Sequence, residues 1–404
     1  MKLSEELVWR GFFNQTTLSD VSVLDKAPIS FYFGADPSAD SLTIGNLAAI
    51  MMVRHFINRG HKAYMLVGGA TGMIGDPDGK KDERQLKTLD EIAHNKTCIV
   101  KQYQFILNEQ SFTVVDNYDW FKDIKYLDFL YMIGKHVPMG QMLNREFVKN
   151  RLGDGGSGIS YAEFSYALIQ GYDFLYLYRE YGVTLQLCGA DQWGNSIAGV
   201  DLIRRLESVD AHVYSNPLIL NRNTGVKFGK SEDGAIWLDA AKTSIYKFYQ
   251  FWLNLDDAGV IDYIRIYTLL NKDEIDELEK QHQQSPAKRI AQKCLAREVT
   301  QLAHGFERTA SVEKVTSVLF GESDFSALNN QDFDILAGEI PTVQLGLTII
   351  EALVSSGLVS SNNEARRLIV SGAISINNQK VIDNQVLNQL AIIKKGKNDF
   401  ILAR

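Results

Sequence analysis

The chain has 404 residues, enough for two or three domains, and its hydrophobic content of 45% and charged content of 23% are those of an ordinary soluble globular protein. The net charge of −7 argues by itself against nucleic-acid binding, and the three scattered cysteines have neither metal-ligand nor redox spacing. No apolar run is long enough to span a membrane and the first residues lack a signal-peptide pattern, so we expect a cytoplasmic protein.

The first half of the chain, residues 1–220, alternates short apolar runs with helical patterns. A strand is predicted at 29–34, a helix at 47–58 and a second strand at 63–69. A strand, a glycine-containing turn, a helix and a strand imply parallel pairing and a Rossmann-like, doubly wound α/β sheet. Ligands bind such sheets beyond the carboxyl ends of the strands. The residues at or just past these ends are Tyr32, Asp36, Thr71 and Asp76.

The pattern changes in the second half of the chain. Residues 221–325 are predicted to form a loop followed by an α-helical domain, because helical periodicity prevails from about residue 232. Residues 326–340 have weak periodicity, which favours a linker. Residues 341–404 combine a helix N-cap signal with a hairpin pattern and predict a small α+β domain. This tail holds seven Lys or Arg against four acidic residues, so it is compatible with local contact to a polyanion.

Two segments of the first half have residues suited to phosphate. In the segment 36–46, small hydroxyl residues precede Gly45 at a helix start, where backbone N–H groups would face an anion. The alternative is a plain strand-to-helix turn. The segment 68–84 has five glycines and then three cations, of which Lys80 and Arg84 could clamp leaving phosphates. The alternative here is a solvated surface loop.

Two further segments suit an amino acid and a ribose. Tyr166, Gln170 and Asp173 recur at i, i+4 and i+7, so on a helix they share one face. Such a polar face suits a small ligand with both an ammonium group and a hydroxyl, although a half-exposed polar face is the alternative. Asp191 follows a predicted strand, a position from which a carboxylate commonly binds ribose hydroxyls.

The fifth segment, residues 226–231, places Lys227 and Lys230 on either side of a Phe-Gly pair, directly after a predicted turn at 221–225. A flexible, doubly cationic loop suits a polyphosphate whose charge shifts during a reaction.

In this order and spacing, the five segments resemble the motifs of bacterial-type tyrosyl-tRNA synthetases, a family of class I aminoacyl-tRNA synthetases. The resemblance covers nearly the whole chain, including an S4-like RNA-binding tail. It implies that L-tyrosine is activated with ATP to tyrosyl-adenylate and then transferred to tRNA(Tyr). It also implies that Mg²⁺ accompanies ATP and that the protein is a homodimer whose interface includes residues 127–136. The residues themselves show no pattern for a metal site of the protein's own.

The resemblance implies a role for each motif residue. The phenolic hydroxyl of tyrosine would be held by Tyr32 and Asp173, and its ammonium and carboxylate by Asp76, Tyr166, Gln170 and Gln192. ATP would be bound by Gly34, Asp36, Ser38, Thr43, Gly45, Asn46, Gly189, Asp191, Lys227 and Lys230. The residues implied in catalysis are Lys80, Arg84, Lys227, Lys230 and Thr43. Those implied in tRNA binding are Arg204, Arg205, Arg366, Arg367 and Lys380.

The chain departs from the family at one signature. The usual His-x-Gly-His becomes Thr43-Ile44-Gly45-Asn46, so a threonine hydroxyl stands where an imidazole normally reaches phosphate. One alternative is therefore a catalytically weakened paralogue that acts as an RNA-binding protein, but the other motif residues are intact and favour an active enzyme. A second alternative is a tryptophan-activating relative. Tyr32 and Asp173 argue against it, because an indole needs no hydroxyl pair.

Overall fold

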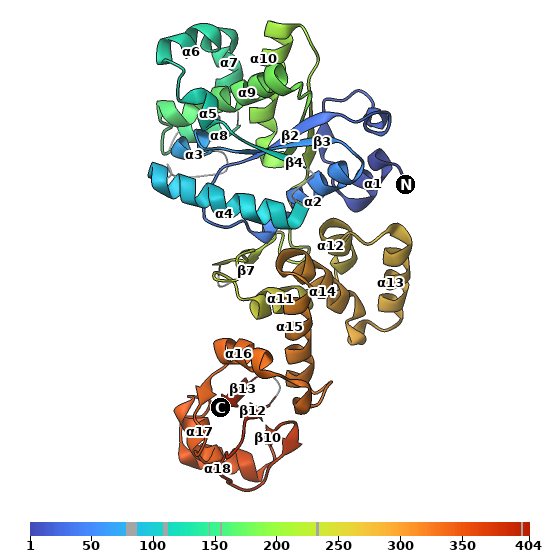
Figure 1. The fold of residues 1–404 in the computed structure, drawn as a ribbon, viewed down its shortest axis with the longest axis vertical. Coiled ribbons are helices and arrows are strands. Elements are labelled where there is room, and N and C mark those ends of the chain that lie inside the picture. Colours follow the sequence, from blue (N-terminus) through green and yellow to red (C-terminus); the bar gives the residue numbers. More distant parts are fainter. Residues whose placement is uncertain (78–86, 108–111, 145, 154–155, 232–233, 397–398) are drawn as a thin grey trace. The chain divides into compact units, whose positions relative to one another are not determined.

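The computed structural model describes the chain except for residues 78–86, 108–111, 145, 154–155, 232–233 and 397–398 (Figure 1). The chain forms two compact units. The first comprises Met1–Thr243 and Leu255–Leu295, and the second comprises Ser244–Asn254 and Ala296–Arg404. The helical domain predicted at 221–325 is therefore divided between the two units. None of the helices within the described ranges is long and apolar enough to cross a membrane.

The first unit contains a six-stranded sheet in the order β1-β6-β5-β2-β3-β4. The strands are β1 (Gln15–Thr16), β2 (Ser30–Ala35), β3 (Lys62–Val67), β4 (Phe112–Asp116), β5 (Leu185–Gly189) and β6 (His212–Asn216). Strands β2 to β6 pair in parallel, and only β1 is antiparallel to its neighbour. The doubly wound sheet predicted from the sequence is confirmed. Its strand order reverses at β2, which lies between β3 and β5, and such switch points are where ligands bind.

Helices cover both faces of this sheet, with α2 and α4 on one face and α9 and α10 on the other (Figure 1). The helices of this unit are α1 (Leu3–Arg10), α2 (Ile44–Asn58), α3 (Thr71–Ile74), α4 (Leu89–Leu107), α5 (Tyr118–Phe121), α6 (Tyr126–Met132), α7 (Met139–Leu143), α8 (Glu146–Leu152), α9 (Tyr161–Tyr181), α10 (Trp193–Glu207), α12 (Val260–Tyr267) and α13 (Lys272–Gln284). Strand β7 (Lys230–Ser231) pairs antiparallel with β8 (Gly234–Ala235).

Helix α9, which carries three of the predicted site residues, is fixed at its start and along its length. Ser160 caps it by accepting a hydrogen bond from the Glu163 N–H at 3.2 Å. Arg151 donates to both carboxylate oxygens of Glu163 at 3.1 and 3.0 Å, and both side chains are buried. Helix α10 packs closely because it has no side chain at Gly199, where a Cβ would lie 2.8 Å from Phe174. Helix α9 therefore holds its predicted site residues Tyr166, Gln170 and Asp173 rigidly.

The second unit ends in the expected α+β tail. Its sheet has the order β11-β10-β12-β13-β9, in which only β13 and β9 pair in parallel. The strands are β9 (Thr342–Val343), β10 (Ile374–Ile376), β11 (Gln379–Lys380), β12 (Ala391–Lys395) and β13 (Asp399–Ala403). The helices are α11 (Ile245–Leu253), α15 (Phe306–Leu319), α16 (Asn330–Glu339), α17 (Ile349–Ser355) and α18 (Asn362–Val370), while α14 (Ile290–His304) begins in the first unit.

The segment 326–340, predicted to be a linker, is instead a folded part of this unit. Asn329 accepts a hydrogen bond from the Asp332 N–H at 3.0 Å and caps α16. Phe333 and Leu336 are buried in a core that also contains Leu402 from β13. The largely polar sequence gives little sign of this helix, because only two of its described apolar side chains are fully buried in the core.

Candidate active site

A buried polar pair lies where β2 and α9 meet. Asp173 is 2% exposed, and its carboxylate accepts hydrogen bonds from Asn117 Nδ2 and Trp120 Nε1, both at 3.0 Å. Burial raises the pKa of Asp173 well above its usual range. Burial and the nearby Asp173 carboxylate raise the pKa of Tyr32, whose hydroxyl finds no hydrogen-bond partner in the described part of the chain. An unpaired buried hydroxyl is costly, so this pair is suited to a ligand hydroxyl.

A chain of hydrogen bonds connects this pair to Asp36, which follows β2. The Tyr166 hydroxyl donates to one carboxylate oxygen of Asp36 at 2.8 Å, and the Thr71 hydroxyl donates to the other at 2.6 Å. Thr71 in turn accepts from Asn117 Nδ2 at 3.1 Å, and Asn117 is the residue that holds the buried carboxylate. Gly68 is required here, because a Cβ would lie 2.4 Å from the Asp36 carboxylate. The two acidic groups are therefore held in one rigid frame.

Asn117 and Trp120 are site residues that the sequence reasoning missed. Both follow β4, the strand next to β3 at the edge of the sheet. The rule that ligands lie beyond strand ends could have found them, but no motif drew attention to this strand.

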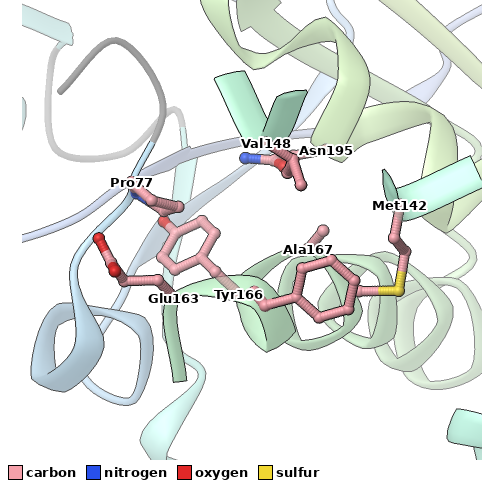
Figure 2. Close-up of a pocket in the computed structure, with 8 residues that line it drawn as sticks. Pro77, Met142, Val148, Glu163, Tyr166, Ala167 and Asn195 are labelled. Carbon is pink, nitrogen blue, oxygen red and sulfur yellow. The ribbon is translucent and has the colours of Figure 1, made fainter. Parts of the chain in front are cut away.

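The other residues predicted to bind the substrate tyrosine include Gln192, just before α10, and Gln170 on α9. Gln192 Nε2 donates to the Asp76 carboxylate, and Gln192 Oε1 accepts from Asn195 Nδ2 at 3.3 Å. Gln170 is half-buried on α9, in the same helix as Tyr166. Figure 2 shows the ring of Tyr166 beside Pro77 in a narrow crevice, which residues of α7, α8, α9 and α10 line. These side chains come from separate segments, and the fold brings them together.

The altered His-x-Gly-His signature forms the start of α2. Thr43 is the N-cap residue, and its N–H and hydroxyl both donate to Asn46 Oδ1 at 2.9 Å. Gly45 follows with its backbone half-exposed. Thr43 and Asn46 thus contact one another and organise the first turn of the helix.

The lysine loop, residues 226–231, and the segment that follows it contact this helix start. Ile44 N–H donates to the Ile236 carbonyl at 3.1 Å, and Thr43 forms a β-bridge with Trp237. Gly229 has φ of +91°, and a Cβ there would lie 2.7 Å from Ile44. The segments 36–46 and 226–231, which are distant in the sequence and are both predicted to bind phosphate, therefore lie in contact.

The cationic residues are described only in part. Lys227 Nζ lies 3.6 Å from Asp191 Oδ2, beyond the end of β5, and both side chains are well exposed. Lys230 belongs to β7, where its backbone pairs with Ala235. Lys80 and Arg84, predicted to clamp phosphate, lie outside the described residues.

Three further residues predicted to bind ATP lie at the strand ends or just past them. Gly34 is in β2, Ser38 follows it and donates from its N–H to the Asp36 carbonyl at 2.8 Å, and Gly189 ends β5. A Cβ at Gly189 would lie 2.6 Å from the Asp191 carboxylate, so glycine lets that side chain fold back over the strand end.

The predicted tRNA-binding residues are distributed over both units. Arg204 and Arg205 are in the last turn of α10, where Arg204 pairs with Asp201 at 3.6 Å and Arg205 donates to the His136 carbonyl at 2.8 Å. In the second unit, exposed basic side chains project from α18 and β11. These are Arg366, Arg367 and Lys380.

A parallel sheet with its switch point at β2, joined to the loop of Lys227 and Lys230 at the start of α2, agrees with the expected class I aminoacyl-tRNA synthetase. Residues 24–321 match the family model for class I tRNA synthetases of the W and Y type, and residues 332–403 match that for the C-terminal domain of SYY-like tyrosine–tRNA ligases. The chain belongs to the tyrosine–tRNA ligase family.

Relatives of full length support this assignment. The chain is 42% identical to the tyrosine–tRNA ligase of Limosilactobacillus reuteri, with 100% of each chain covered, and 44% identical to that of Amoebophilus asiaticus, with 98% of each covered. Among solved structures, a C-terminally truncated mitochondrial tyrosyl-tRNA synthetase of Aspergillus nidulans has a TM-score of 0.71 and 27% identity, covering 79% of this chain and 94% of that chain. None of these findings supports the alternative of an RNA-binding paralogue.

Proposed function

We propose that tyrosine activation, the first reaction of this ligase family, takes place between β2, α9 and the lysine loop, with the phenolic hydroxyl of tyrosine between Tyr32 and Asp173. The observation that carries this proposal is the buried Tyr32 hydroxyl beside a buried carboxylate that already has two donors. Phenylalanine would leave the Tyr32 hydroxyl unpaired and would give the Asp173 carboxylate no further donor. Such a site rejects the wrong amino acid strongly, and tyrosyl-tRNA synthetases are themselves the standard example of this discrimination.

The rest of the amino acid would lie along the same frame. Asp76, Tyr166 and Gln170 would bind the ammonium group, and Gln192 would lie near the carboxylate. That carboxylate is the nucleophile: one of its oxygens bonds to the α-phosphorus of ATP while the bond from that phosphorus to the bridging oxygen breaks and pyrophosphate leaves. The protein supplies no acid or base for this step. It supplies position and charge, which the rigid hydrogen-bonded frame supports.

ATP would lie between the strand ends and the start of α2. The groups proposed for the ribose are the backbone near Gly34 and Gly189 and the carboxylate of Asp191, with Asp36 at the junction to the amino acid. Ser38, Thr43, Gly45 and Asn46 would face the phosphates. Lys227 and Lys230, together with Lys80 and Arg84 from the segment outside the described residues, would balance the charge of the leaving pyrophosphate. Mg²⁺ would arrive with ATP, since this ion is commonly bound through substrate phosphates.

Tyrosine-dependent exchange of pyrophosphate into ATP tests the proposed site. Exchange should require tyrosine, and phenylalanine and tryptophan should support it poorly. Tyr32→Phe removes one hydroxyl and should reduce the preference for tyrosine over phenylalanine. An unchanged preference in this variant would contradict the proposed position of the phenol.

Thr43→Ala is expected to slow tyrosyl-adenylate formation and to leave tyrosine affinity nearly unchanged, because Thr43 lies on the phosphate side. It also removes a helix cap, which costs about 0.5–2 kcal/mol of stability. Thr348 is likewise the N-cap residue of a capping box, at the start of α17 in the tail, so Thr348→Ala is a control for the loss of a capping residue. Single-turnover kinetics should separate the two variants. Equal rates in both would make Thr43 a structural residue only.

We propose that Arg204, Arg205, Arg366, Arg367 and Lys380 contact tRNA(Tyr). Reversing charge with Arg366→Glu and Arg367→Glu together should lower kcat/KM for tRNA by about tenfold or more and flatten its salt dependence, because phosphate contacts release counterions. Pyrophosphate exchange should be unchanged. Lys101→Glu with Lys280→Glu changes the net charge equally on exposed helices of the first unit and serves as the control. An equal loss in both double variants would contradict a local contact.

We also propose a homodimer formed through α6 and the start of α9. Several large side chains are exposed there, with Tyr126 at 60%, Leu127 at 73%, Tyr131 at 72% and Tyr161 at 62%. The Tyr126 and Tyr161 hydroxyls lie 3.1 Å apart, and exposed large side chains that lie close together support an interface. Sedimentation at increasing protein concentration measures the association.

A cytoplasmic location is part of the same proposal, because tRNA charging serves translation.

A further inference from the structure

One aromatic residue of α12, Tyr263, contacts both sides of the segment that leads into the lysine loop. Its hydroxyl donates to the Leu220 carbonyl at 3.2 Å and accepts from the Arg222 N–H at 3.4 Å. Its ring stacks on Phe228, with centroids 4.4 Å apart and an interplanar angle of 22°. Tyr263 is 4% exposed and Phe228 is also 4% exposed. A single buried side chain therefore holds the entry to the loop and the residue next to Lys227.

The segment that Tyr263 holds is a narrow hairpin. The Phe228 N–H donates to the Ile219 carbonyl at 2.8 Å, and Leu220 forms a β-bridge with Lys227. Arg222 at the tip pairs with Asp262, the neighbour of Tyr263 on α12, at 2.6 Å. Because Lys227 is part of this hairpin, whatever fixes the hairpin also fixes the point from which the lysine side chain extends.

Helix α12 is a firm support for this hairpin. Arg10 on α1 is buried and donates to three carbonyls at the end of α12 and just beyond it. These are the carbonyls of Arg265, Thr268 and Leu270, at 2.8, 3.1 and 2.7 Å. Helix α12 also packs against α2, whose first turn contacts the loop at Gly229. The loop is therefore supported from α12 before Phe228 and from α2 after it.

We infer that Tyr263 is a positioning residue for tyrosine activation, which sets the Lys227 ammonium for the leaving pyrophosphate. This inference rests on the proposed role of Lys227. The loop contains a glycine in the left-handed region at Gly229, which gives the backbone little stiffness of its own. A charge stabilises a transition state well only when it is held in place beforehand, and here the stiffness comes from the stacked ring and its hydroxyl. Tyr263 acts through Lys227 and does not touch the substrate.

A double-mutant cycle tests the inference. Tyr263→Leu, Lys227→Ala and the double variant are compared by single-turnover formation of tyrosyl-adenylate at saturating tyrosine. Tyr263→Leu should slow the step by about 5- to 30-fold, with unchanged tyrosine affinity. In the Lys227→Ala background the same substitution should slow it by less than about twofold, because residues that act as one unit are not additive. A general loss of folding would instead multiply with the effect of Lys227→Ala.

Two further variants keep the test interpretable if Tyr263→Leu fails to fold. Tyr263→Phe keeps the stacked ring and removes only the hydroxyl, and should give a smaller slowing with the same dependence on Lys227. Tyr214→Phe removes another buried tyrosine hydroxyl, on β6, and should leave the rate unchanged. Multiplying effects, or a normal rate in Tyr263→Leu beside a slow Lys227→Ala, would overturn this inference alone. A normal rate in Lys227→Ala would overturn the proposed role of the lysine as well.

Discussion

Replacing Asp173 by asparagine should lower kcat/KM for tyrosine by about 100-fold or more, because several hydrogen bonds to a buried charge are lost together. The carboxylate accepts from Asn117 and Trp120, and an amide would point its own N–H donors at one of them. Asn117 cannot simply turn round, since its amide also donates to Thr71 and accepts from the Ala70 N–H. The phenol of tyrosine would lose its charged acceptor at the same time.

The amino-acid preference separates this loss from general damage. Phenylalanine offers no hydroxyl to Asp173, so its kcat/KM should fall much less, and the ratio of the two values should decrease. Glu163→Gln disturbs another buried carboxylate on the same helix, one that pairs with Arg151, and serves as a control. If both variants lower the two kcat/KM values in parallel, the proposed contact with the phenol is incorrect.

The same substitution should change the pH dependence of tyrosine binding. Burial raises the pKa of Asp173, so this carboxylate takes up a proton at a higher pH than an exposed one. Only the ionised form is a charged acceptor for the phenol. Affinity should therefore fall as the pH drops through the raised pKa, and this dependence should be missing in Asp173→Asn. Equilibrium titration with tyrosine over a range of pH measures it.

Much of the site could be predicted because its residues follow simple local rules. Asp36 follows β2 and Asp191 follows β5, as the strand-end rule requires, whereas Tyr32, also predicted near a strand end, lies within β2. Tyr166 and Asp173 follow helical spacing along α9. The pattern indicates where Asp36, Asp191 and the α9 residues lie, and the resemblance to the family implies what they bind.

The supports of these residues could not be predicted, because they come from distant segments. Asp173 is held by residues that follow β4, and the lysine loop is held by Tyr263 on α12. Neither contact has a local signature, since hydrogen bonds and stacking between segments depend on how the whole unit packs. Helix α16 was hidden for a similar reason: its capping residues are visible in the sequence, but its two buried apolar residues acquire meaning only beside the tail sheet.

Lys227→Ala should reduce the rate of tyrosyl-adenylate formation by about 10- to 150-fold, which corresponds to the loss of one charged hydrogen bond of about 1.5–3 kcal/mol. Thr43 is already engaged with Asn46, so the start of α2 contributes fewer donors to phosphate than an imidazole would. The loop should therefore carry a larger part of the pyrophosphate charge. Tyrosine affinity should not change, because Lys227 lies beside Asp191, the carboxylate that we propose binds ribose.

The ion pair between Lys227 and Asp191 gives this prediction a second observable. Both side chains are well exposed, so the pair contributes little to stability, about 0–1 kcal/mol. Lys227→Ala should accordingly leave the melting temperature nearly unchanged while the reaction slows. Lys272→Ala removes a comparable exposed pair with Asp276 on α13 and should affect neither quantity. A slow reaction that is accompanied by a large loss of stability would mean that Lys227 supports the fold of the loop, and that the pyrophosphate charge is balanced by other cations.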